Sequence, residues 1–109
     1  MKKIITTILF VLLTIYSFNC QTFQMALGGA QEEFAYSIQQ TEDNGFVMAG
    51  RTYSFGTGGW ECYLSRFNGN GDTLWTRTFG NVLYDEFQDV DTTSDGGFIA
   101  VGHTTTTDW

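Results

Sequence analysis

Three polar side chains at alternate positions form the candidate metal site of this sequence. Asn68, Asn70 and Asp72 lie in the stretch NGNGD and are spaced like the first three ligands of a calcium-binding loop. Such a loop also has glycine at its sixth position and glutamate at its twelfth, where this chain has Thr73 and Phe79. Because Asn and Gly readily adopt the positive φ angles of tight turns, the pattern favours a hairpin turn. Calcium binding by these three residues is the weaker alternative.

The sequence shows no recognisable catalytic motif. Its single histidine, His103, is not accompanied by a nucleophile and base in any known arrangement. There is no G-x-S-x-G elbow, no H-E-x-x-H pair and no phosphate-binding loop. The glycine-rich stretch FGTGG leads into a predicted strand, so it does not offer the helix N-terminus that binds phosphate. We therefore expect that the protein is not an enzyme and binds no cofactor.

A second acidic group could also attract calcium, and we interpret it as the solvated start of a strand. Its members are Asp85, Glu86, Asp89 and Asp91.

Aromatic side chains are the remaining candidates for ligand binding. A carbohydrate-stacking surface could draw on Tyr53, Phe55, Trp60, Trp75, Tyr84 and Trp109. Among them, Phe55 and Trp60 lie in the glycine-rich loop YSFGTGGW, and loops commonly carry binding residues. We therefore predict Phe55 and Trp60 as the ligand-binding loop, with a surface glycan or a protein as the partner.

The chain contains an internal repeat that must position these residues. TEDNGFVMAGRT at 41–52 returns as TSDGGFIAVGHT at 93–104, an offset of 52 residues. The agreement extends without a gap back to Phe23, which aligns with Trp75, and this favours Trp75 as a repeated core residue. Repeats of roughly 40–50 residues are typical of β-propeller blades.

One repeat reads as four short strands joined by turns. The expected strands are Ala35–Thr41, Phe46–Thr52, Glu61–Asn68 and Thr73–Gly80. The second of them has apolar residues on both faces, which suggests a sheet packed between neighbours. We predict an all-β fold of propeller-like, four-stranded antiparallel blades, with a β-sandwich or a β-solenoid as alternatives.

The repeat also predicts the domain organisation. We expect a signal peptide at 1–20 and an incomplete propeller-like domain at 21–109. Within it, 22–29 form a lone fourth strand, 35–80 a full blade and 87–109 a partial blade. From this arrangement we expect the chain to be an N-terminal fragment of a longer repeat protein.

The first twenty residues have the pattern of an export signal. Lys2 and Lys3 precede an apolar run at 4–16 that is too short for a membrane-spanning helix. Cys20 gives a weaker alternative, a lipid anchor at a bacterial lipoprotein cleavage site, although SFNC departs from the usual pattern. Cys62 lies in an apolar strand, and we expect it to be a small buried residue.

Charge excludes one class of partner. Without residues 1–20, three arginines would face 12 acidic residues, a net charge of −9. Such a surface repels phosphate backbones, so we expect no binding to nucleic acid.

Two long stretches resemble a known repeat family. ECYLSRFNGNGDTLWTRTFG and FGNVLYDEFQDVDTTSDGGFIAVGHT are similar to repeats of secreted bacterial proteins with propeller-like folds. Many members of that family end in a type IX secretion sorting domain and reach the cell surface. The resemblance covers residues 22–104, with departures at Asn44, Asn81 and Cys62. It implies a secreted or outer-surface location, but says little about activity because a fold does not determine a function.

These observations predict a secreted or cell-surface repeat protein that serves as a non-catalytic binding or structural module. Two alternatives remain: the non-catalytic start of a larger secreted hydrolase, and a lectin-like carbohydrate-binding module.

Overall fold

The computed structural model describes residues 24–106 of the chain. The expected signal peptide at 1–20, the lipid-anchor hypothesis for Cys20, and Trp109 therefore lie outside the described residues. Among residues 24–106, no helix has the length and apolarity that crossing a membrane requires.

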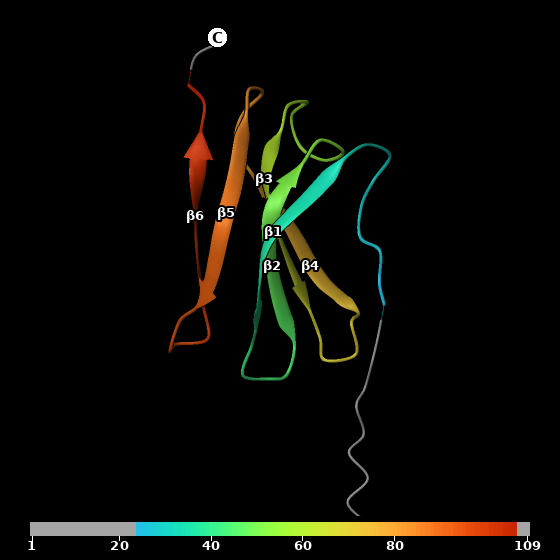
Figure 1. The fold of residues 1–109 in the computed structure, drawn as a ribbon, viewed down its shortest axis with the longest axis vertical. Coiled ribbons are helices and arrows are strands. Elements are labelled where there is room, and N and C mark those ends of the chain that lie inside the picture. The colour runs from blue at the N-terminus through green and yellow to red at the C-terminus, as the bar shows by residue number, and fades with distance from the viewer. Residues whose placement is uncertain (1–23, 107–109) are drawn as a thin grey trace, which may run out of the picture.

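Six antiparallel strands make up the described fold, as Figure 1 shows. They are β1 (Glu33–Gln40), β2 (Phe46–Thr52), β3 (Glu61–Phe67), β4 (Thr73–Phe79), β5 (Asp85–Thr92) and β6 (Phe98–Thr104). Strands β1 to β4 form one sheet in chain order, and β5 pairs with β6 in a second sheet. The all-β, antiparallel prediction is confirmed, and the β2 bounds agree with the sequence pattern residue for residue.

The lone fourth strand expected at 22–29 has no paired strand as its neighbour among the described residues. Residues 24–29 are not part of any strand. A fourth strand pairs with the free edge of a third strand, but both edges of β3 are occupied, by β2 and by β4. The residues of this segment therefore have no edge of that kind to join in the described part of the chain.

The second sheet repeats the start of the first one. Strands β5 and β6 begin and end 52 residues after β1 and β2. A β-bulge interrupts the pairing between Ala35 and Ser37, and another does so between Phe87 and Asp89, again 52 residues later. A bulge adds local twist to a strand, so both hairpins have the same distortion at the same position.

The two hairpin turns also share their geometry. Asn44 has a φ of 62° and Gly96 a φ of 80°, which confirms the positive φ angles expected from the turn residues. Thr41 N donates to Gly45 O at 2.9 Å, and Thr93 N donates to Gly97 O at 2.9 Å. The local sequence thus specifies each hairpin in the same way.

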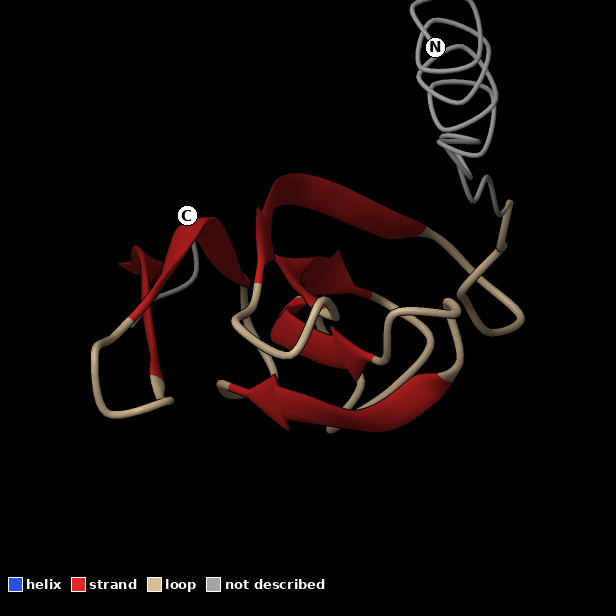
Figure 2. Ribbon diagram, turned by 90° about the horizontal axis from the view of Figure 1, so that it is seen from below, coloured by secondary structure: helices blue, strands red, loops and turns tan. Residues whose placement is uncertain are grey.

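The core lies between the two sheets. Strand β5 lies against β1, β2 and β3, and the view from below in Figure 2 shows the two-stranded sheet beside the four-stranded one. Val47, Ala49, Leu64 and Val90 are the buried apolar centre of this contact. Around them pack the partly buried side chains of Trp75, Phe87, Phe98 and Ala100. The expectation that Trp75 is a core residue is confirmed.

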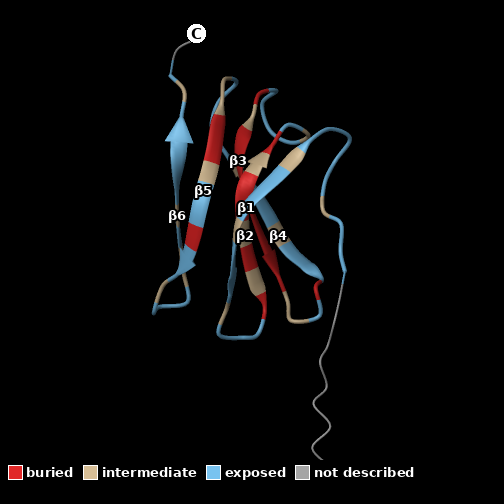
Figure 3. Cartoon of the chain, viewed as in Figure 1, coloured by how far each residue is buried: buried red, intermediate tan, exposed pale blue. Residues whose placement is uncertain are grey.

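Burial is uneven across the strands. Figure 3 shows buried residues concentrated in β2, β3 and parts of β5, whereas β6 is exposed except at the half-buried Phe98 and Ala100. All seven residues of β3 are buried; β3 is a central strand of its sheet, and β5 of the second sheet lies against it.

Candidate functional site

An arginine surrounded by aromatic rings lies where the two sheets meet. Arg51, in β2, pairs with Phe34 of β1 and Cys62 of β3. Its guanidinium carbon lies 4.4 Å from the ring centre of Trp60 and 4.6 Å from that of Phe34. The rings of Tyr84 and Tyr36 are 5.0 and 5.8 Å away. A guanidinium so close to aromatic rings is attracted by the negative electrostatic potential of their faces.

Glu86 supplies the counter-charge from the second sheet. Arg51 Nη1 lies 2.9 Å from Glu86 Oε2, and the hydroxyl of Tyr84 donates to the same oxygen at 2.9 Å. Gln88 Nε2 donates to the other carboxylate oxygen at 3.3 Å, and His103 Nδ1 lies 3.6 Å from it. Glu86 is 8% exposed. The ion pair is therefore largely desolvated and links β2 to β5.

The glycine-rich loop positions Trp60 in this cluster. Gly56 and Gly58 have φ angles of 103° and 111°, which allow the loop to turn back on itself. The amide and the hydroxyl of Thr57 both donate to Glu61 Oε1. Asp85 N donates to the carbonyl of Trp60 at 2.7 Å, so the loop is also bound to the second sheet.

The outer rim of the cluster is hollowed. A cavity of about 290 Å³ is lined by Gln31, Glu32, Tyr53 and Trp60. Tyr53 is 38% exposed and meets Trp60 edge to face, with ring centres 5.1 Å apart. Aromatic faces beside an amide and a carboxylate can stack on a sugar ring and hydrogen-bond its hydroxyls.

The structure does not bring the two predicted loop aromatics into one site. Trp60 packs against Phe34 and Tyr53, whereas Phe55 stacks on Tyr63 with ring centres 5.8 Å apart. Phe55 is 41% exposed. Trp60 is therefore the member of the predicted pair that belongs to the Arg51 cluster.

The NGNGD stretch forms a turn held by its own hydrogen bonds. Asn68 Oδ1 accepts from Asn70 N at 3.0 Å and from Asp72 N at 2.9 Å. Asn68 Nδ2 donates to Asp72 Oδ2 at 2.9 Å, and Gly71 has a φ of 90°. The hairpin-turn interpretation accounts for these contacts. Across residues 24–106, no three His, Cys, Asp or Glu side chains gather in a way that could hold a metal ion.

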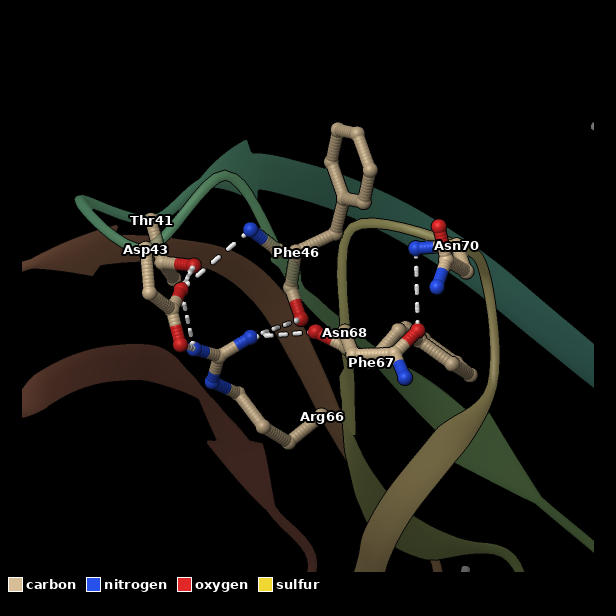
Figure 4. Close-up of polar contacts among 8 residues, drawn as sticks. Thr41, Asp43, Phe46, Arg66, Phe67, Asn68 and Asn70 are labelled. Carbon is tan, nitrogen blue, oxygen red and sulfur yellow. Dashed lines mark hydrogen bonds and ion pairs between the residues drawn. The ribbon is translucent and has the colours of Figure 1, made fainter. Parts of the chain in front are cut away.

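A second ion pair ties the first hairpin turn to β3, as Figure 4 shows. Arg66 Nη2 lies 2.7 Å from both carboxylate oxygens of Asp43, and Arg66 Nη1 donates to the carbonyls of Phe46 and Phe67. The hydroxyl of Thr41 donates to Asp43 Oδ1 at 2.5 Å. The Thr41 hydrogen bond and then Arg66 lower the pKa of Asp43 to about 2.

The interpretation of the acidic group at 85–91 as solvated is wrong for its first two members. Asp85 is fully buried and Glu86 is 8% exposed. Asp85 accepts from the hydroxyl of Thr104 and from Asn81 N, the latter at 2.7 Å. These hydrogen bonds replace the water that a carboxylate loses on burial. Asp89 and Asp91 are exposed, as expected.

Cys62 is a buried free thiol, which confirms the prediction from its apolar surroundings. Burial, followed by the negative charge of Asp85, raises its pKa to about 11. Since the thiolate is the reactive form, Cys62 is unreactive at neutral pH.

Sequence reasoning missed the central residue of the site. Arg51 was visible only as the residue that aligns with His103 at a strand end. The structure shows that both positions face Glu86, with Arg51 ion-paired and His103 stacked on Tyr84 at a ring distance of 5.5 Å. The sequence did contain one signal for this site: both repeats have a residue that can carry a positive charge at the same position, and aromatic residues lie in the preceding strand.

A comparison with models of known protein families matches none of them, and a search of curated proteins finds no match either.

Proposed function

We propose that this chain belongs to a secreted or cell-surface repeat protein whose four-stranded sheets stack like propeller blades, acting as a non-catalytic binding or structural module. The observation that carries the proposal is the sheet-on-sheet contact between two hairpins whose strands have the same lengths and lie 52 residues apart in the sequence. Propeller blades of four antiparallel strands pack against one another in this manner.

A contact between equivalent positions supports a stack that can continue. Ser37 Oγ donates to Asp89 Oδ1 at 2.6 Å, and these positions are 52 residues apart. The first strand of one sheet thus touches the first strand of the next sheet at the same place. Repeating such a head-to-tail contact generates either a closed ring or an open helical array.

The coding sequence beyond codon 109 tests this proposal against the hydrolase alternative. Further copies of the 52-residue repeat, with or without a sorting domain, would support a repeat protein of the surface. A catalytic domain in the same reading frame would instead identify the described sheets as the non-catalytic start of a larger secreted hydrolase.

Export is tested with a reporter that is active only outside the cytoplasm. A bacterial fusion of the chain to alkaline phosphatase is expected to be active, and deletion of residues 1–20 is expected to abolish the activity. Replacing Cys20 by alanine distinguishes the two signals, because only lipoprotein processing needs that cysteine. Equal activity with and without residues 1–20 would contradict export through this segment.

The hollow beside Trp60 favours a second candidate function, carbohydrate binding. Tyr53 and Gln31 line it without contributing to the ion pair of Arg51. Tyr53→Ala and Gln31→Ala are therefore expected to abolish glycan-array binding while the fold is retained. Leu74→Ala, at an exposed position in β4, is the matched control. An intact chain that binds no glycan would exclude this candidate.

A further inference from the structure

Each sheet has one face in the core and one face on which no other sheet lies, within the part of the chain that the structure describes. The face of β1 and β2 turned away from β5 includes Ile38 and Met48, which are cross-strand partners. The face of β6 turned away from the core includes Ile99 and Val101. We refer to these as the β1–β2 outer face and the β6 outer face.

The β6 outer face repeats a surface that is buried elsewhere in the molecule. Ile99 and Val101 follow Val47 and Ala49 by 52 residues, at the same positions of two strands of equal length. Val47 and Ala49 are 0% exposed, whereas Ile99 and Val101 are each 57% exposed. The same two apolar positions are thus covered by a sheet in β2 and uncovered in β6.

The β1–β2 outer face repeats the surface that does the covering. Val90 and Ala100, which pack on Val47 and Ala49 in the core, follow Ile38 and Met48 by 52 residues. Val90 is 1% exposed, but Ile38 is 59% exposed. Beside Ile38 lies a hollow of about 260 Å³ with an apolar lining that includes Met25, Leu27 and Met48.

We propose that the chain binds a second copy of itself head to tail, with the β1–β2 outer face of one copy on the β6 outer face of the other. The two free faces are the two halves of a contact that the molecule already makes between its own sheets. No new type of surface is needed, because the internal interface provides the template for the external one. Exposed apolar surfaces of this kind commonly mark interaction sites.

Polar groups at the edge of the template fit the same arrangement. Inside the molecule, Ser37 donates to Asp89. Between copies, Asp89 of one molecule would occupy the position that Ser37 has inside the molecule, and Ser37 of the other copy would occupy the position of Asp89. The ion pair of Arg51 with Glu86 has no counterpart between copies, because His103 and Phe34 occupy those positions. The contact between copies is therefore weaker than the internal one.

The proposal is tested by two variants that each disable one face. Ile38→Lys places a charge on the β1–β2 outer face, and Ile99→Lys places one on the β6 outer face, opposite Asp91. Val82→Lys is the matched control, since Val82 is 65% exposed in the β4–β5 connection and lies on neither face. Sedimentation velocity of the full chain under reducing conditions, between about 1 and 100 μM, covers the range of a micromolar self-association.

The wild type and Val82→Lys are expected to gain mass with concentration, whereas Ile38→Lys and Ile99→Lys each remain monomeric. An equimolar mixture of the two face variants is expected to form a species of two chains and nothing larger, since one intact copy of each face remains. The apolar run at 4–16 is common to all samples, so it cannot explain a difference between them. A monomeric wild type would overturn the proposal and leave these faces to a different partner. A mixture that stays monomeric, or single variants that associate like the wild type, would overturn it as well.

Discussion

The hairpins β1–β2 and β5–β6 have strands of the same lengths, a bulge at the same position and the same turn geometry, yet they differ sharply in burial. Ala49 in β2 is completely buried, and Val101, at the same position of β6, is 57% exposed. The difference lies in the neighbours. Strand β2 has β1 and β3 at its edges and β5 on its face, whereas β6 pairs with β5 alone among the described strands.

The comparison separates two contributions to the fold. Local sequence determines the conformation of each hairpin, because both copies form it in different surroundings. Burial, in contrast, comes from the packing of a neighbouring sheet on an apolar face. Substitutions at equivalent positions can therefore measure the two contributions independently.

A charge at equivalent positions is expected to give the largest difference. Ala49→Lys places an unpaired charge in the contact between the sheets and is expected to cost about 4 kcal/mol of unfolding free energy. Val101→Lys, on an exposed face opposite Asp89, is expected to change it by less than about 0.5 kcal/mol. Urea denaturation followed by Trp fluorescence measures both. Equal losses would show that β2 and β6 have the same surroundings in solution.

A methyl group at two equivalent glycines is expected to have the same effect in both hairpins. A Cβ at Gly50 would lie 1.8 Å from the carbonyl oxygen of Phe34, and one at Gly102 would lie 1.9 Å from that of Glu86. Because each clash lies within its own hairpin, Gly50→Ala and Gly102→Ala are each expected to cost about 3 kcal/mol. Thermal unfolding of the two variants side by side checks this. If Gly102→Ala were neutral, the second hairpin would not have the described register.

Loss of the cation at positions 51 and 103 is expected to have unequal effects. Arg51→Ala leaves the buried Glu86 without its ion-pair partner and is expected to cost about 2 kcal/mol. His103 is half exposed and 3.6 Å from Glu86, so His103→Ala is expected to cost less than about 0.5 kcal/mol. Urea midpoints of both variants and of Arg51→Lys measure the difference. An equally large loss of unfolding free energy in His103→Ala would show that the structural role does not belong to Arg51 alone.

Acid is expected to affect the two turns to different extents. The pKa of Asp43 is lowered from 3.8 to about 2, by the Thr41 hydroxyl first and then by Arg66. The pKa of Asp95 is lowered as well, by the Thr93 hydroxyl first, and Arg66 is not among the causes. A carboxylate with a lowered pKa stabilises the fold above its ordinary pKa, and that stabilisation disappears as the pH falls through its pKa in the fold.

The corresponding experiment measures urea midpoints between pH 5 and pH 2. Asp43→Asn is expected to flatten the loss of stability below about pH 4 more than Asp95→Asn does. Arg66→Gln is expected to reduce this difference. Identical pH profiles for the two asparagine variants would rule out a distinct contribution from the ion pair.

The sequence predicted the strands well because their signals are local. The turns DNG at 43–45 and DGG at 95–97 join the two strands of each hairpin, and the pattern of FVMAGRT predicts the β2 bounds correctly. The first strand was expected at Ala35–Thr41 but spans Glu33–Gln40. Its first residue, Glu33, is charged, and the hydrogen bond that Glu33 accepts from the Thr52 hydroxyl comes from its cross-strand partner in β2, which the local pattern of β1 does not show.

The candidate site was predicted only in part because it combines residues from both sheets. Trp60 was recognised from its glycine-rich loop, but its partner Arg51 is explained only once Glu86 is placed beside it. The burial of Asp85 likewise depends on the hydroxyl of Thr104, 19 residues away, and no local pattern shows it. Contacts between segments far apart in the sequence could thus not be predicted from local patterns.

Cysteine labelling at the two equivalent positions tests the central claim most directly. Ala49→Cys and Val101→Cys, each in a Cys20→Ser background with buried Cys62 as an internal reference, are treated with a thiol reagent at submicromolar concentration. At that dilution, association between copies does not protect β6. The thiol at 101 is expected to react at the rate of an exposed cysteine, and the thiol at 49 at least about 100-fold more slowly, because it reacts only when the sheets separate. Equal rates at the two positions would contradict the account, since β5 and β6 would then not pack on the first sheet.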